Sequence, residues 1–201
     1  MDNAQLEPES SANSLTAAAL WNTGSGNCIE VSYDRELWPE KTMGHFAQIS
    51  TKLLDHINVE FALDGVFVGL LLCGDDRIRR LNRQFCGKDW ATNVLSFPQL
   101  DDVFFGDDAS AAAHQIDQQF IGEIAIARET IMAQAAELGI GIDDHLAHLF
   151  VHGLMHLLGF DHENDQEATE MESLEISILA AVSVANPYLI ADRVAHHGVM
   201  K

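Results

Sequence analysis

The chain has 201 residues, 47% of them hydrophobic and 21% charged, which suits one globular domain with extensions and excludes wholesale disorder. Its formal net charge of -20 at pH 7 argues against a broad nucleic-acid-binding surface, because such a surface clusters Lys and Arg. Five of the 11 basic residues nevertheless fall within residues 77–88, which indicates either a local basic patch or the solvated face of an amphipathic helix.

Cysteine content and the N-terminal segment bear on location. The three cysteines are widely spaced and odd in number, which favours a reducing compartment over a disulfide framework. The opening segment MDNAQLEPESSANS lacks the basic start and apolar run of a signal peptide. No apolar run approaches the roughly 20 residues of a membrane span. We therefore expect a cytoplasmic protein with no membrane partner.

The first predicted elements follow a polar segment. Residues 1–26 are rich in Ser, Asn, Ala and Gly, so we expect a flexible extension in which LTAAALW forms at most a helical turn. Residues 28–33 alternate like a half-exposed strand, and residues 41–57 carry a helical apolar stripe. The continuous apolar run 66–73 predicts an interior strand. Residues 75–86 predict a helix capped by Asp75 or Asp76, with an apolar face of Ile78, Leu81 and Phe85.

The second half predicts two more strands, 93–98 and 120–127, separated by a loop at about 101–117. A helix then ends at Gly139 or Gly141. The next predicted helix is 142–159, capped by Asp143 or Asp144. The last predicted helix is 166–182, with its glutamates facing outward and four apolar residues facing inward: Met171, Leu174, Ile178 and Leu179. This order predicts an α+β fold with a small mixed four-stranded sheet flanked by helices, in one domain over 27–190 followed by a tail at 191–201.

A histidine motif, HGLMHLLGFDH, spans residues 152–162. His152 and His156 lie four residues apart, so a helix places both imidazoles on one face. Gly159 permits a break in the helix, after which His162 can return to the same point. Three neutral nitrogens with a fourth position open suit Zn²⁺. The alternative is that these three are surface or core histidines without a metal. His145 and His148 extend the same helical face, and we expect them to be polar neighbours or groups that support a ligand, not ligands themselves. His148 is the better candidate to support a ligand.

Gly153 stands where peptidases of the HExxH type carry a catalytic glutamate. Glycine accepts no proton, so ordinary metallopeptidase chemistry is disfavoured. Metal-assisted phosphodiester hydrolysis does not need this glutamate, because the ion itself is a Lewis acid and RNA carries its own 2′-hydroxyl nucleophile.

The segments HGLMHLLGFDHE, KDWATNVLSFP and IGEIAIA together resemble the YbeY family of endoribonucleases, over roughly residues 28–185. The resemblance implies a single α+β domain and one zinc ion held by His152, His156 and His162, which would act in catalysis through the metal. It implies hydrolysis of single-stranded RNA, chiefly in maturation of the small-subunit rRNA 3′ end and in ribosome quality control. The expected partners are rRNA and small-subunit ribosomal proteins.

The chain departs from the family pattern at two positions. Cys86 stands where the family usually has an Arg, and a neutral thiol cannot grip phosphate as guanidinium does. Cys86 is then a fourth metal ligand, a redox thiol or a small helix-end side chain. Either a neighbouring basic residue substitutes, for which we expect Arg83 and Lys88 with Arg79 a further candidate, or substrate binding is altered. Glu123 replaces the usual Asp and retains the carboxylate.

Other polar residues near these motifs have two interpretations each. Asp161 orients a ligand histidine or forms the turn after the helix. Thr92, Asn93 and Ser96 line a cleft or make hydrogen bonds at the end of a strand. Two rival functions remain: a metallopeptidase that uses a distant carboxylate as base, and a non-catalytic ribosome-associated module in which zinc only stabilises the fold.

Overall fold

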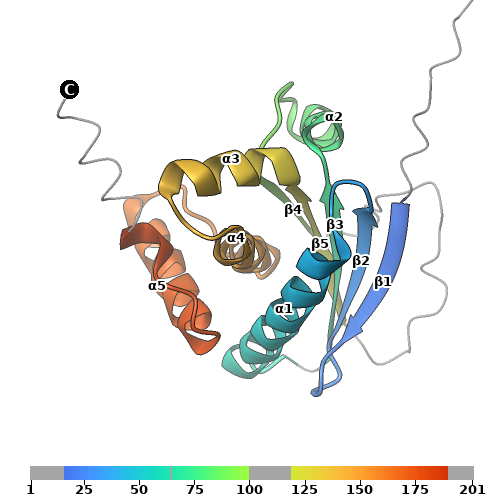
Figure 1. Ribbon diagram of the computed structural model, residues 1–201. Helices are drawn as coiled ribbons and strands as arrows, with labels where there is room; N and C mark the ends of the chain where they lie inside the picture. The colour runs from blue at the N-terminus through green and yellow to red at the C-terminus, as the bar shows by residue number, and fades with distance from the viewer. Residues whose placement is uncertain (1–15, 64, 100–118, 190–201) are drawn as a thin grey trace, which may run out of the picture.

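The computed structural model describes residues 16–63, 65–99 and 119–189 (Figure 1). The expected loop at 101–117 and tail at 191–201, and the first fifteen residues of the expected extension, lie outside these ranges. In chain order the elements are β1 (Thr16–Asn22), β2 (Cys28–Asp34), α1 (Glu40–Glu60), β3 (Val66–Cys73), α2 (Asp75–Cys86), β4 (Val94–Pro98), β5 (Gln119–Ala127), α3 (Arg128–Leu138), α4 (Ile142–Leu157) and α5 (Asp165–Ala181). The mixed α+β class is confirmed.

The sheet has five strands in the order β1-β2-β3-β5-β4, so the prediction of four strands was wrong. The additional strand is β1, which lies within the segment expected to be a flexible extension and pairs antiparallel with β2. Three of the seven residues of its sequence TAAALWN are alanine, a residue with weak strand preference, so the pattern was easy to miss. Pairing with β2 and burial of Ala17 stabilise it instead.

The two faces of the sheet carry different layers. Along β3 and β5, Leu70, Leu72 and Ile124 belong to the main core, which includes buried residues of α1, α4 and α5. The alternating residues Leu71 and Ala125 point to the opposite face, where they pack with Ile78 of α2. Figure 1 shows α4 in the middle of the helical layer, surrounded by α1, α3 and α5. The histidine motif therefore lies on the most enclosed helix of the fold.

Helix ends and faces follow the predictions in part. Gly139 ends α3 in the left-handed conformation, as expected. The N-caps of α2 and α4 are Gly74 and Gly141, so the capping roles predicted for aspartates were wrong. Asp75 instead accepts hydrogen bonds from the backbone and hydroxyl of Thr130, which joins α2 to α3. None of the described helices combines the length and the apolar character needed to cross a membrane.

The predicted apolar face of α2 was only partly right. Ile78 is fully buried, but Phe85 is 40% exposed and the polar Asn82 is 2% exposed. Asn82 is buried because its side-chain amide donates a hydrogen bond of 2.9 Å to the backbone oxygen of Trp90. This contact ties the loop after α2 to the helix.

Candidate metal centre

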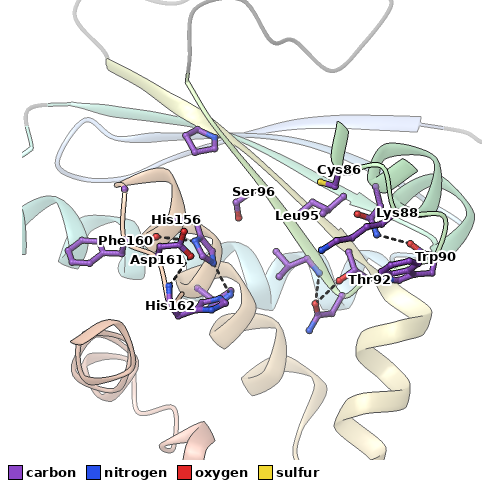
Figure 2. Close-up of a pocket in the computed structure, with 16 residues that line it drawn as sticks. Cys86, Lys88, Trp90, Thr92, Leu95, Ser96, His156, Phe160, Asp161 and His162 are labelled. Carbon is purple, nitrogen blue, oxygen red and sulfur yellow. Dashed lines mark hydrogen bonds between the residues drawn. The ribbon is translucent and has the colours of Figure 1, made fainter. Parts of the chain in front are cut away.

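The three histidines of the motif converge. His152 and His156 project from successive turns of α4, and Gly159 (φ +89°), just past the helix end, takes a left-handed conformation that turns the chain back. One nitrogen of each of His152, His156 and His162 lies within 4.8 Å of the other two. Figure 2 shows His156 and His162 directed toward one another from the helix and from the turn after it. The convergence predicted from the spacing is what the structure has.

Hydrogen bonds set the orientation of two of these rings. The Nδ1 atom of His156 lies 3.0 Å from the backbone oxygen of Phe160, and that of His152 lies 2.9 Å from Oε1 of Glu175. Because a carbonyl and an ionised carboxylate only accept, each Nδ1 carries the proton and donates it. Each neutral ring then has its lone pair on Nε2. The two Nε2 atoms lie 3.2 Å apart, so these lone pairs share one small region.

The donor set fits a metal ion. Burial, with the neighbouring His152 and His162, lowers the pKa of His156, which keeps its imidazole neutral and able to ligate. With both Nδ1 atoms engaged, the Nε2 atoms of His152 and His156 lie 3.2 Å apart, close enough to bind one shared cation. Three imidazole nitrogens with a side left open are the ligand set of a catalytic zinc site. Among the described residues, this trio is the group placed to hold a metal.

Glu175 is the residue that the sequence analysis missed. The glutamates of α5 were expected to face outward, yet Glu175 is fully buried. Its Oε1 accepts from His152, while its Oε2 accepts from His148 at 3.0 Å and from the hydroxyl of Tyr188. Position 175 is four residues after buried Met171, so the helical spacing was the available signal.

The charge state of Glu175 follows from these contacts. Burial opposes its ionisation, but the hydrogen bonds from His148, His152 and Tyr188 outweigh burial and lower its pKa to about 2. Burial and the hydrogen bond to Glu175 raise the pKa of Tyr188, so its hydroxyl stays protonated and donates. A permanent buried carboxylate therefore fixes the tautomer of His152 and increases its basicity, as carboxylate partners do for zinc-ligating histidines.

Packing explains the glycine at position 153. A Cβ added there would lie 2.9 to 3.2 Å from three carbon atoms of Ile124 in β5. α4 thus rests directly on the sheet at this point, and Gly153 faces the sheet and not the pocket. At the position used for the base in HExxH peptidases, a side chain would therefore fit only if Ile124 shifted.

A pocket of about 740 Å³ opens beside the histidines (Figure 2). One end, the histidine end, is formed by His152, His156 and His162 with the turn that joins them. The other, the loop end, is formed by Cys86, Lys88 and Trp90, and β4 supplies the wall between them. This volume is within the range of about 300–1,000 Å³ that is usual for ligand sites.

Three polar residues, two just before β4 and one within it, were expected either to line a cleft or to make hydrogen bonds at the end of a strand. Thr92, Asn93 and Ser96 all line the pocket. Asn93 also makes hydrogen bonds at the start of the strand: its side-chain amide donates to Oε1 of Gln134 at 3.1 Å, and its Oδ1 accepts from the backbone N–H of Val94. The Oγ of Ser96 is buried without a hydrogen-bond partner among the described residues.

The two basic residues expected to contact phosphate are placed differently. Lys88 lines the pocket. Arg83 is not among the lining residues; its side chain is 64% exposed and lies 4.0 Å from Oδ1 of Asp89. Arg79 makes a bidentate contact with the same carboxylate, at 2.9 and 3.1 Å. Arg79 and Arg83 are therefore both paired with Asp89, and of these three basic residues Lys88 is the one that lines the pocket.

Cys86 lies at the loop end, exposed, at the last position of α2, and outside the histidine trio. The carboxylate of Asp161 accepts a hydrogen bond of 2.8 Å from the backbone N–H of His162. Asp161 therefore contributes to the turn that carries the third histidine. Glu123 is not among the pocket residues. It lies opposite Gly69 of β3, where an added Cβ would be 2.9 Å from its Cγ, so this glycine leaves room for the longer side chain.

Two further histidines extend along α4. His148 shares the Glu175 carboxylate with His152, and its ring lies edge-on to that of His152 with 6.3 Å between the centroids. His145 is buried, and its Nε2 lies 3.0 Å from Oε1 of Gln134. Burial lowers the pKa of His145 to about 4. Both are accounted for by contacts other than ligation, as the sequence analysis favoured.

The chain is similar to a family of known proteins. The family model described as Endoribonuclease YbeY matches residues 33–183. Curated relatives named Endoribonuclease YbeY include one from Allorhizobium ampelinum, 37% identical, covering 80% of this chain and 93% of the relative, and one from Rhodopseudomonas palustris, 35% identical, covering 94% and 92%. A solution structure from Thermotoga maritima aligns with a TM-score of 0.45 at 24% identity, covering 77% of this chain and 88% of that chain. With a model matching three quarters of its length and relatives matched nearly end to end, this chain belongs to the YbeY endoribonuclease family.

Proposed function

We propose that this protein is a zinc-dependent endoribonuclease that hydrolyses single-stranded RNA. The observation that carries the proposal is the convergence of His152, His156 and His162 at one end of an open pocket. The names of the curated relatives support the same activity. The proposed biological role is maturation of rRNA, chiefly at the small-subunit 3′ end, and ribosome quality control. Its partners would then be rRNA and small-subunit ribosomal proteins, in the cytoplasm.

The residues of the pocket divide the work. When bound by the three nitrogens, a zinc ion supplies a Lewis acid for a phosphoryl oxygen of the scissile bond. Glu175 and the Phe160 carbonyl hold the Nδ1 protons of His152 and His156, which keeps both Nε2 atoms directed at one point. Lys88 places a positive charge at the loop end, where a neighbouring backbone phosphate binds.

The packing of Gly153 and the burial of Glu175 argue against peptidase chemistry of the HExxH type. Gly153 packs on Ile124, so no carboxylate is available next to the first ligand. The nearest ionised carboxylate to His152, Glu175, is fully buried and already accepts three hydrogen bonds. It orients a ligand and is not positioned to take a proton from a substrate.

The test combines metal analysis with cleavage assays. The purified protein should contain one zinc ion per chain and cleave unstructured RNA, and a chelator should abolish that cleavage. His156→Ala should lose both metal and activity. His45→Ala is the matched control, because His45 is exposed and outside the histidine trio. If the metal-free His156→Ala variant cleaves RNA at the normal rate, or denatured protein is cleaved in place of RNA, the proposal is wrong.

A further inference from the structure

The loop end of the pocket presents an aromatic side chain to solvent. Trp90 is 58% exposed and lines the pocket. None of the aromatic ring pairs found among the described residues includes it. A single exposed apolar residue is common on protein surfaces and needs no explanation by itself. What distinguishes Trp90 is how the loop around it is held.

Three successive residues of this loop are attached to α2, each by a different group. The backbone N–H of Lys88 donates to the backbone oxygen of Asn82 at 3.2 Å. The carboxylate of Asp89 accepts both hydrogen bonds from Arg79. The backbone oxygen of Trp90 accepts from the buried side chain of Asn82. These contacts fix the main chain while using neither the ammonium group of Lys88 nor the indole of Trp90.

The two free side chains form a pair with complementary chemistry. Among the described residues, no carboxylate forms an ion pair with Lys88, whereas Arg79 and Arg83 both contact Asp89. Lys88 and Trp90 are two residues apart and both line the pocket, and Figure 2 shows them at the loop end, with Ser96 lying between that end and the histidines. A cation beside an exposed aromatic face, on a fixed loop, is the arrangement that binds one phosphate and one unstacked base of a single strand.

We propose that Trp90 is a base-binding platform, on which an unpaired base of the RNA stacks while Lys88 binds the adjoining phosphate. The inference rests on the proposed function and refines it. The stacked base belongs to a nucleotide flanking the scissile bond, because the histidines lie at the opposite end of the pocket. Duplex RNA, whose bases are already stacked on one another, offers no free face to the indole. Trp90 therefore selects single strands.

The experiment measures binding of short strands to the zinc-loaded full chain, by indole fluorescence and by anisotropy of a labelled strand. The three probes are oligoadenylate, oligouridylate and an abasic strand of equal length and charge. The expected affinity order is adenylate, uridylate, abasic, with quenching only by the strands that carry bases. Trp90→Ala should weaken adenylate binding about tenfold, within the range known for loss of one stacked base, and leave the abasic strand unaffected. Trp90→Phe should retain the affinity but lose the quenching.

Leu20→Ala is the matched control, since Leu20 is 55% exposed on β1, the strand at the sheet edge opposite β4. Melting temperatures of all variants should agree, because the exposed indole contributes little to the core. Equal affinity for abasic and adenylate strands, or unchanged binding by Trp90→Ala, would overturn the base platform even if RNA is cleaved. Stacking that depends on Trp90 in a protein that cleaves no RNA would uphold the platform and reject the proposed nuclease activity.

Discussion

At the histidine end of the pocket, hydrogen bonds hold the side chains of two ligands; at the loop end they hold the loop itself and do not involve the side chains of Lys88 and Trp90. His152 and His156 each donate Nδ1–H to a fixed acceptor, Glu175 or the Phe160 carbonyl. Lys88 and Trp90, by contrast, are exposed on a loop that is attached to α2 through its backbone and the Asp89 carboxylate. The difference matches two tasks. A metal needs ligands at set distances, whereas a flexible strand needs a surface to which it can adapt.

The contrast should show most strongly in what each end tolerates. Gly153→Glu at the histidine end should destabilise the fold by more than about 3 kcal/mol, because the new side chain overlaps Ile124 and buries a charge. Gly153→Ala should cost less, since overpacking of about 1–3 kcal/mol is partly offset by the helix preference for Ala over Gly of about 1 kcal/mol. Urea denaturation measures both. A stable Gly153→Glu variant would show that the helix does not rest on the sheet as described.

The carboxylate that orients His152 should control metal affinity. An amide oxygen can replace only one side of a carboxylate that accepts three hydrogen bonds, so Glu175→Gln should raise the zinc dissociation constant about 10- to 100-fold. Competition with a chromophoric chelator measures this without reference to activity. The control is Glu172→Gln, at an exposed position on the same helix. Equal zinc affinity in both variants would remove the orienting role of Glu175.

Acid should lower the free energy of unfolding through a buried histidine of α4. Burial lowers the pKa of His145 to about 4, against an ordinary value of 6.5, so the unfolded chain binds this proton first as pH falls. Stability is therefore complete above about pH 6.5 and falls toward pH 4. His145 contributes a loss of about 2 kcal/mol between pH 7 and pH 4.5. Urea melts of His145→Asn should show a correspondingly shallower pH dependence than the unmodified protein, and an identical slope would refute the assignment.

The smallest expected effect is a difference between Lys88 and Arg83 in the salt dependence of RNA binding. Lys88 lines the pocket, so Lys88→Ala should lower the slope of log affinity for RNA against log salt by about 0.7. Arg83 lies outside the pocket lining beside Asp89, so Arg83→Ala should lower it by less. The double variant should have the flattest slope. A larger effect from Arg83 would place the phosphate path outside the pocket, and unchanged affinity in the double variant would remove both residues from the site.

The histidine end was more predictable from sequence than the loop end, for a physical reason. His152, His156 and Gly159 act through spacing along one helix, and spacing is visible in a sequence. Glu175 comes from another helix, and its burial depends on donors supplied by α4 and Tyr188. A glutamate in an acidic, amphipathic segment looks solvent-exposed until those donors are known.

The same limit applied to the sheet and to the basic cluster. The strands 66–73 and 120–127 were recognisable because their apolar runs are buried on both faces. β1 was not, because its stability comes from pairing with β2. Among the basic residues, composition indicated a patch, but which of them is free depends on where Asp89 lies in space.

The most direct measurement is diffraction from crystals of the zinc-loaded full chain at the zinc absorption edge. We predict one ion per chain, bound at about 2.0–2.1 Å by one nitrogen from each of His152, His156 and His162, with the fourth position facing the pocket. An ion bound elsewhere, a fourth ligand supplied by a protein side chain, or a His162 ring directed away from the other two would contradict it.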